Sequence, residues 1–249
     1  MAYHHAVTRE NYQDLASGSV LRSAPGLPAF PVRLASEVFQ RAVALRGRSG
    51  PVTVWDPCCG SGYLVTVLGF LHRAALSAVV ASDLDERALS LARANLALLT
   101  DRGLTARAAE LRVLAERHDK PGYRETADTA LRLRARLAEG GDVPVTVLAA
   151  DAFDPAPAVA DRFREGGPDI VLTDVPYGER TDWLGPAASG GTAGMLGAVA
   201  SVVPPETVLA VATRGRKVPL AGLRPAESLR VGTRAVALLR AGQVVEACA

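Results

Sequence analysis

The fold class is decided by residues 52–99, which read VTVWDPCCGSGYLVTVLGFLHRAALSAVVASDLDERALSLARANLALL. Two short apolar runs in this stretch, at 52–55 and 78–82, have the length and composition of buried strands. Each run is followed by a longer apolar pattern, at 63–72 and 86–99, of the kind that forms a helix. Strands that alternate with helices build a parallel sheet with helices on both faces. We therefore expect an α/β protein with a doubly wound, mostly parallel sheet.

The alternation continues toward the C-terminus. Further strands are predicted at 145–149, 169–173 and 207–212. The runs 229–231 and 234–239, separated by Gly232-Thr233, have the pattern of a terminal hairpin. Together with the first two strands, these runs predict a seven-stranded sheet.

Two segments lie outside the alternation. Residues 1–30 contain many turn formers and predict an extended arm, after which Pro31 opens a helical pattern at 32–45. Between about 101 and 142, two helical patterns replace the usual short connection and predict a helical insertion on the surface. Its Arg residues are nearly balanced by acids, so a solvated hairpin and an RNA-contacting extension both stay open. We expect a single domain over 1–249, with the arm and first helix at 1–47.

The composition limits the class of protein. Hydrophobic residues make up 49% of the chain, which is typical of a folded protein. The formal net charge is only +2, so a polyanionic partner must be met by a local patch. Three Cys without metal-ligand spacing argue against a disulfide framework or a metal site. With neither a signal-like N-terminus nor a long apolar stretch, we expect a soluble, cytoplasmic protein that binds neither membrane nor metal.

A glycine-containing turn, Asp56-Pro57-Cys58-Cys59-Gly60-Ser61-Gly62, follows the first strand. Glycines at such a turn let the backbone approach a ligand closely. A dinucleotide site needs a third glycine three residues further on, but position 65 is Val. The acid at the start of the turn repels phosphate and suits the ammonium of a methionine moiety. The turn therefore favours a zwitterionic adenosyl ligand without phosphate.

Carboxylates also end the next two strands. Asp83 lies where an acid accepts hydrogen bonds from ribose hydroxyls, whereas Asp85 suits the N-cap of the following helix. Asp151 ends the third strand, where it can accept a hydrogen bond from an adenine amino group. Any one of these residues alone can be a cap or a turn residue. Their order at the ends of successive parallel strands indicates a ligand site.

These motifs resemble those of the Rossmann-like class I S-adenosylmethionine-dependent methyltransferases. Residues 56–62, 81–85 and 150–152 are similar to the first three motifs of that class, and Phe30-Pro31 with Leu34-Ala35 is similar to an upstream motif that closes over the cofactor. The resemblance implies S-adenosylmethionine as cofactor. The cofactor-binding residues that it implies are Phe30, Asp56, Pro57, Cys58, Gly60, Gly62, Asp83, Asp151 and Ala152.

The fourth strand leads into Thr173-Asp174-Val175-Pro176-Tyr177-Gly178. This segment is similar to the Thr-Asp-Pro-Pro-Tyr-Gly motif of tRNA and rRNA guanine methyltransferases, with Val175 replacing a Pro. Methyl transfer needs a nitrogen lone pair in line with the methyl group, and Asp174 can accept the proton that masks it. Tyr177 offers an aromatic face for a base drawn out of its helix. We expect Asp174 and Tyr177 to be catalytic and Pro176 to bind the substrate.

Basic residues near the predicted active-site edge are candidates for RNA contact. Arg214, Arg216 and Lys217 follow the fifth strand and can meet phosphates, or can simply be solvated. Arg22 and Arg33 lie near the arm and are further candidates. Because Cys58 and Cys59 lie in the cofactor turn, small packing residues explain them better than a nucleophile. His4 and His5 are neighbours in a loose arm, where a surface role is expected.

From about Ala24 to Leu239 the chain resembles the family of avilamycin-resistance methyltransferases, which modify a guanine in 23S ribosomal RNA. That resemblance implies methylation at guanine N1 in 23S rRNA or the large ribosomal subunit, with antibiotic resistance as the outcome. Guanine N2 stays second, because the motif usually accompanies amino groups. A protein glutamine amide is another acceptor, although its enzymes favour Asn at position 174. A non-catalytic RNA-binding module is the alternative of a different class.

Overall fold

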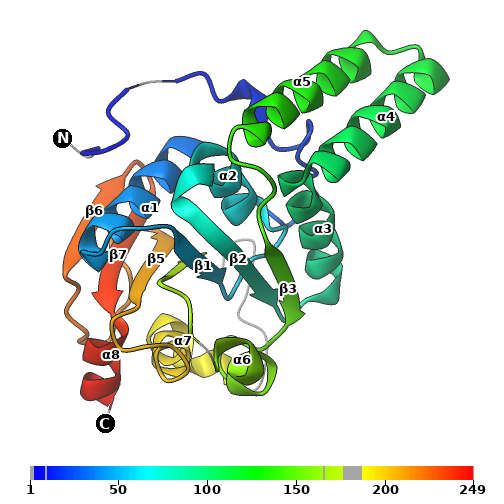
Figure 1. Ribbon diagram of the computed structural model, residues 1–249. Helices are drawn as coiled ribbons and strands as arrows, with labels where there is room; N and C mark the ends of the chain where they lie inside the picture. Colours follow the sequence, from blue (N-terminus) through cyan, green and yellow to red (C-terminus); the bar gives the residue numbers. More distant parts are fainter. Residues whose placement is uncertain (1–2, 9, 165, 176–186, 249) are drawn as a thin grey trace.

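The computed structural model describes residues 3–8, 10–164, 166–175 and 187–248. Within these residues, seven strands form one sheet in the order β3-β2-β1-β4-β5-β7-β6 (Figure 1). The strands are β1 Val52–Asp56, β2 Leu76–Asp83, β3 Val145–Ala149, β4 Ile170–Asp174, β5 Val208–Arg214, β6 Glu227–Val231 and β7 Arg234–Arg240. Each lies within about two residues of a run predicted from the sequence, and the predicted fold class is confirmed.

The sheet is parallel from β3 to β5. Strand β1 pairs with both β2 and β4, and the antiparallel pairs are β5 with β7 and β7 with β6. The chain runs outward from β1 through β2 to β3, and then returns to the other side of β1 with β4. Strand order therefore reverses between β1 and β4, which is where ligands bind at the carboxyl edge of doubly wound sheets.

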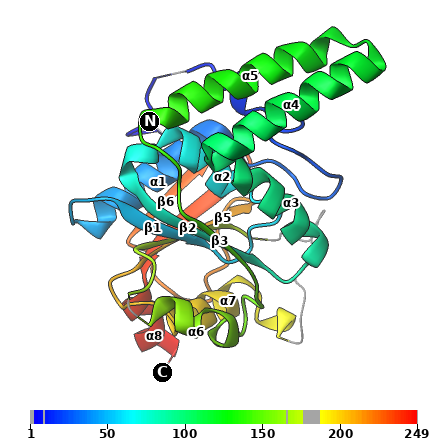
Figure 2. The same ribbon diagram turned by 45° about the vertical axis from the view of Figure 1, so that its right-hand side comes forward.

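Each face of the sheet carries its own layer of helices (Figures 1 and 2). Residues along the central strands alternate between the two layers: Ile170 and Leu172 belong to one apolar cluster and Val171 to the other. One face is covered by α1 Val32–Arg46, α2 Tyr63–Leu71 and α3 Glu86–Leu96, and the other by α6 Ala156–Phe163, α7 Gly191–Ala200 and α8 Ala241–Cys248. The last three helices were not assigned from the sequence, so the predicted terminal hairpin is followed by a helix.

Two long helices project from the body of the molecule (Figure 2). They are α4 Asp101–His118 and α5 Pro121–Ala138, and they pack against each other along their length. The hydroxyl of Thr100 caps α4 by accepting from the backbone N–H of Gly103 at 3.0 Å. Leu104 and Leu133 are buried between the helices and the body. No described helix is long and apolar enough to cross a membrane.

The N-terminal arm is anchored rather than loose. The buried carboxylate of Glu37 accepts the backbone N–H groups of residues 4, 5 and 6 at 2.7–2.9 Å, which ties His4 and His5 to α1. Burial opposes ionisation of Glu37, but these donors and Arg41 bring its pKa down to about 2. Leu15, Val20 and Leu21 are buried in the core. The expectation of a loose arm is therefore wrong, because side chains far along the chain satisfy its backbone.

Both arginines suggested near the arm for RNA contact have intramolecular partners. Arg33 donates to the carbonyls of Ala6 and Val7, each at 2.8 Å. Arg22 forms an ion pair with Glu110 of α4. Their polar groups secure the arm, and contact of these two residues with RNA stays a prediction.

Candidate functional site

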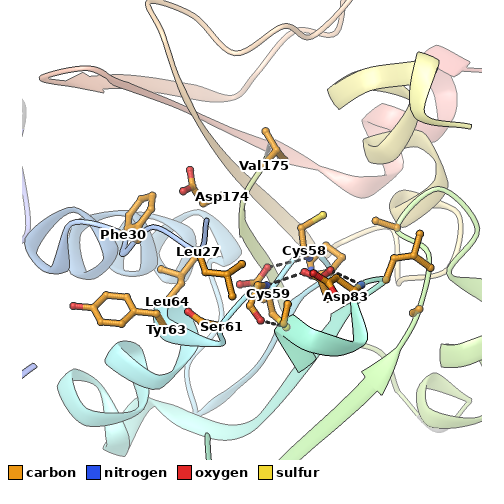
Figure 3. Close-up of a pocket in the computed structure, with 18 of the residues that line it drawn as sticks. Leu27, Phe30, Cys58, Cys59, Ser61, Tyr63, Leu64, Asp83, Asp174 and Val175 are labelled. Atoms are coloured by element: carbon orange, nitrogen blue, oxygen red, sulfur yellow. Dashed lines mark hydrogen bonds between the residues drawn. The ribbon is translucent and has the colours of Figure 1, made fainter. Parts of the chain in front are cut away.

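A pocket lies at the carboxyl edge of the sheet, on the reversal of strand order (Figure 3). Its empty space, including open solvent at the mouth, is about 1040 Å³. The arm contributes Leu27, Pro28 and Phe30 to the wall. The remaining wall comes from residues that follow or end the first four strands, mainly 56–61, 83–85, 150–153 and 174–175. The pocket is thus built by segments from the whole first two thirds of the chain.

The structure brings nearly all of the predicted cofactor-binding residues together. Those that line the pocket are Phe30, Asp56, Pro57, Cys58, Gly60, Asp83, Asp151 and Ala152. Gly62 is not part of the lining. Its φ of +69° places it at the start of α2, where an added Cβ would lie 3.1 Å from the Cα of Ala92 in α3. Gly62 therefore lets α2 approach α3 closely, and its role in cofactor binding stays a prediction.

The turn after β1 is held open by the neighbouring strand. The backbone N–H of Gly60 donates to Asp83 Oδ2 at 2.8 Å, and that of Cys59 donates to the carbonyl of Ser82 at 2.9 Å. Gly60 has φ +52°, which an L side chain adopts only with strain. Asp83 therefore shapes the turn as well as facing the pocket.

Three carboxylates of the pocket have no ion pair with a described cation. Among the described residues, no ion pair involves Asp56, Asp83 or Asp151. Burial raises the pKa of Asp56 to about 7, and repulsion from Asp83 and Asp174 acts in the same direction. Burial also raises the pKa of Asp83. This end of the pocket therefore suits a ligand that brings positive charge and disfavours one that brings phosphate.

The paired cysteines are poor nucleophiles. Burial raises the pKa of both Cys58 and Cys59 well above the ordinary thiol value, and the Asp56 carboxylate adds to the effect. A thiol attacks as its thiolate, which this environment disfavours. Their position in the turn agrees with a packing role. No described group of His, Cys, Asp and Glu is arranged to hold a metal ion.

Asp174 lines the same pocket, and its side chain lies on the same side of it as Phe30 (Figure 3). Its Oδ1 accepts a hydrogen bond from Arg234, the first residue of β7. Arg234 was not among the residues predicted from the sequence. The only signal was the position of Arg234, two residues before Val236 and therefore on the same face of β7. Ala235, on the opposite face, is buried as well. Alternation along the strand therefore does not identify Arg234 as a buried arginine.

The remaining substrate candidates lie elsewhere or cannot be placed. Pro176 and Tyr177 fall outside the described residues. Arg214 ends β5 directly opposite Arg234 in the strand register. Arg216 and Lys217 are exposed on the following loop and do not line the pocket.

The sheet order and the carboxylates at its carboxyl edge are those of a class I methyltransferase. Within that class the chain belongs to the AviRa family of rRNA methyltransferases, whose family model matches residues 1–234. A relative from Streptomyces viridochromogenes, named 23S rRNA (guanine(2535)-N(1))-methyltransferase, is 55% identical over 247 residues, covering 99% of this chain and 98% of the relative.

The fold of the family is also seen in solved structures. Two structures of the rRNA methyltransferase AviRa from Streptomyces viridochromogenes match this chain with TM-scores of 0.90 and 0.91. Sequence identity is 55% and 54%, and each match covers 99% of both chains. The likeness therefore includes the arm and the α4–α5 hairpin as well as the sheet.

Proposed function

We propose that this chain transfers a methyl group from S-adenosylmethionine to ring N1 of a guanine in 23S ribosomal RNA. The observation that carries the proposal is the row of aspartates at the ends of four successive parallel strands, gathered in one pocket: Asp56, Asp83, Asp151 and Asp174. Membership of an rRNA methyltransferase family and the name of the 55% identical relative support the acceptor.

The pocket residues fit S-adenosylmethionine. Asp56 would face the ammonium of the methionine moiety, Asp83 the ribose hydroxyls and Asp151 the adenine amino group. The positive charge of this ligand compensates for carboxylates that the described residues leave without cations. When bound, it supplies a methyl group on a sulfonium, whose sulfur keeps the bonding electron pair as the methyl leaves.

Asp174 would act on the acceptor. Guanine N1 carries a proton, and its lone pair becomes nucleophilic as that proton is accepted or polarised. Asp174 Oδ1 is bonded to Arg234, and no described residue donates to Oδ2. Oδ2 is therefore the oxygen that can accept the N1 proton. Tyr177, outside the described residues, would stack on the base.

Guanine N2 is the second candidate acceptor, because the Asp-Pro-Pro-Tyr form of the motif usually accompanies amino groups, and Val175 departs from that form. Val175 is fully buried, and its backbone N–H donates to the carbonyl of Ala212 at 2.9 Å. That bond needs an N–H, which a Pro does not have. The backbone after Asp174 is thus tied to β5, in a way that the Asp-Pro-Pro-Tyr form does not allow.

The test is incubation of the protein with labelled cofactor, separated ribosomal RNAs and ribosomal proteins, followed by mass analysis of the nucleosides. We expect label in 23S rRNA as 1-methylguanosine. Asp174→Ala should abolish it, while Asp161→Asn, an exposed acid on α6, should not. Label found only in protein would contradict the RNA acceptor. Label found as N2-methylguanosine would show that the acceptor is N2 and not N1. Cells expressing the wild-type enzyme should also become resistant to avilamycin.

A further inference from the structure

One buried arginine contacts both sides of the pocket. Arg234 is 5% exposed, and its Nη1 donates to Oδ1 of Asp174 at the end of β4. Its guanidinium carbon also lies 4.7 Å from the ring centroid of Phe30, which belongs to the arm. Phe30 and Asp174 both line the pocket, and Asp174 is the residue proposed to act on the acceptor. A single side chain therefore joins the two halves of the site.

We propose that Arg234 is the positioning residue of the acceptor site: it holds the carboxylate of Asp174 in one orientation and in its charged form, and braces it against Phe30. The inference rests on the proposed function, in which Asp174 accepts a proton from guanine. Because Oδ1 receives Arg234, rotation of the carboxylate is restricted and Oδ2 keeps a fixed place.

The charges around Asp174 explain why it needs this partner. The side chain of Asp174 is 16% exposed, and burial raises its pKa. The charge of Asp174 in turn helps to raise the pKa of Asp56 at the end of β1, after the larger effect of burial. Arg234 of β7 and Arg214 of β5 lower the pKa of Asp174. Without Arg234, Asp174 would keep its proton to higher pH, and a protonated carboxyl cannot accept another from guanine N1.

The stacking on Phe30 distinguishes arginine from lysine. A planar guanidinium can lie over an aromatic ring while its edge binds a carboxylate, whereas a lysine ammonium is a flexible point charge. Arg234→Lys therefore keeps the charge and loses the fixed geometry. Arg234→Met removes the charge and keeps most of the volume. Arg230→Met is the matched control, because Arg230 is an exposed arginine on the adjacent strand β6.

The experiment has two readouts. The first is a carbon-13 NMR titration of the aspartate carboxyls without cofactor or RNA, with Asp174 assigned by its missing signal in Asp174→Asn. The second is the pH dependence of RNA methylation. In Arg234→Met we expect the titration midpoint of the Asp174 carboxyl to move to higher pH by about one unit or more. The acidic limb of the pH–rate profile should move to higher pH by the same amount. Arg230→Met should leave both unchanged. Arg234→Lys should keep the limb in place and lower kcat at every pH.

An unchanged Asp174 midpoint in a folded Arg234→Met protein would overturn the inference, whatever the methylation assay gives. If thermal unfolding shows that Arg234→Met does not fold, the kcat of Arg234→Lys is the deciding measurement. A kcat equal to that of the wild type would overturn the positioning role. Absence of methyl transfer by the wild type is a different result: it removes the proposed function, while the titration still tests whether Arg234 keeps Asp174 charged.

Discussion

The side-chain amide of Asn95 binds the backbone of Arg22 on both sides. Oδ1 accepts from the N–H of Arg22 at 2.7 Å, and Nδ2 donates to its carbonyl at 3.0 Å. The same Nδ2 also donates to the carbonyl of Ser61, in the glycine turn, at 2.9 Å. A fully buried asparagine on α3 thus fastens the arm to the turn that lines the pocket.

Asn95→Ala should therefore weaken both the fold and cofactor binding. One buried backbone group, of Ser61, and two partly buried ones, of Arg22, lose their partner, and we expect about 2 to 4 kcal/mol less free energy of unfolding. Asn11→Ala, an exposed asparagine in the arm whose Oδ1 accepts only from the N–H of Gln13, is the control and should change it by about 1 kcal/mol or less. Urea denaturation and cofactor calorimetry are the measurements. A destabilised Asn95→Ala with unchanged cofactor affinity would show that the arm and the pocket are independent.

Cofactor binding should release a proton at pH 6. Burial raises the pKa of Asp56 to about 7, so the free protein carries this carboxyl mostly protonated below that pH. An ammonium placed beside it favours the carboxylate and lowers the pKa, and the proton leaves. Calorimetry in buffers of different ionisation enthalpy measures the release.

Asp56→Asn should reduce the release strongly. Asp154→Asn, exposed and outside the pocket, should behave as wild type. Proton uptake, or a release that Asp56→Asn does not alter, would place the ammonium elsewhere.

Asp174→Asn should separate the two nitrogen acceptors. The amide keeps an oxygen for Arg234 but loses the charge that accepts a proton. For ring N1, turnover should fall by about a hundredfold to ten-thousandfold, the range for general acid–base groups. Cofactor affinity should stay near wild type. A small loss of turnover would favour N2, since an exocyclic amine can attack while only hydrogen-bonded.

The exposed loop after β5 should contribute to RNA binding through charge. We expect Arg216→Gln with Lys217→Gln to lower the slope of log affinity against log salt by about one for each phosphate that the loop no longer neutralises. Arg214 is left in place, because it faces Arg234 across the β5–β7 pair. Arg48→Gln, exposed at the opposite edge of the sheet, is the control. An unchanged slope in the double variant would show that this loop is solvated and does not contact RNA phosphates.

The strands and the ligand carboxylates could be predicted because their signals are local. Runs such as Val52–Asp56 are apolar over one strand length and end in an acid, so the sequence indicates both the strand and the side chain at its carboxyl end. The parallel arrangement then brings Asp56, Asp83 and Asp151 to one edge of the sheet. Helix α7 was missed because its Gly and Ala residues give little periodicity.

The arm and Arg234 could not be predicted in the same way. The sequence alone suggested that Arg22 and Arg33 are surface charges. Their hydrogen-bond partners, however, lie 88 residues away for Arg22 and 26–27 residues away for Arg33. Arg234 stands beside a hairpin turn, where arginine is usually exposed. Only the register of β7 against β5, together with the arm folded over it, turns Arg234 inward.

The anchoring of the arm also orders events in time. Asp14 in the arm forms an ion pair with Arg132 of α5, 118 residues later in the chain. At about 5–20 residues per second, a ribosome takes about 6 to 24 s to make that interval. Arg107 of α4 likewise donates to the carbonyls of Ser19 and Val20 in the arm, and these bonds cannot form before α4 has been made. The segment that is synthesised first is thus held by side chains that are synthesised long after it.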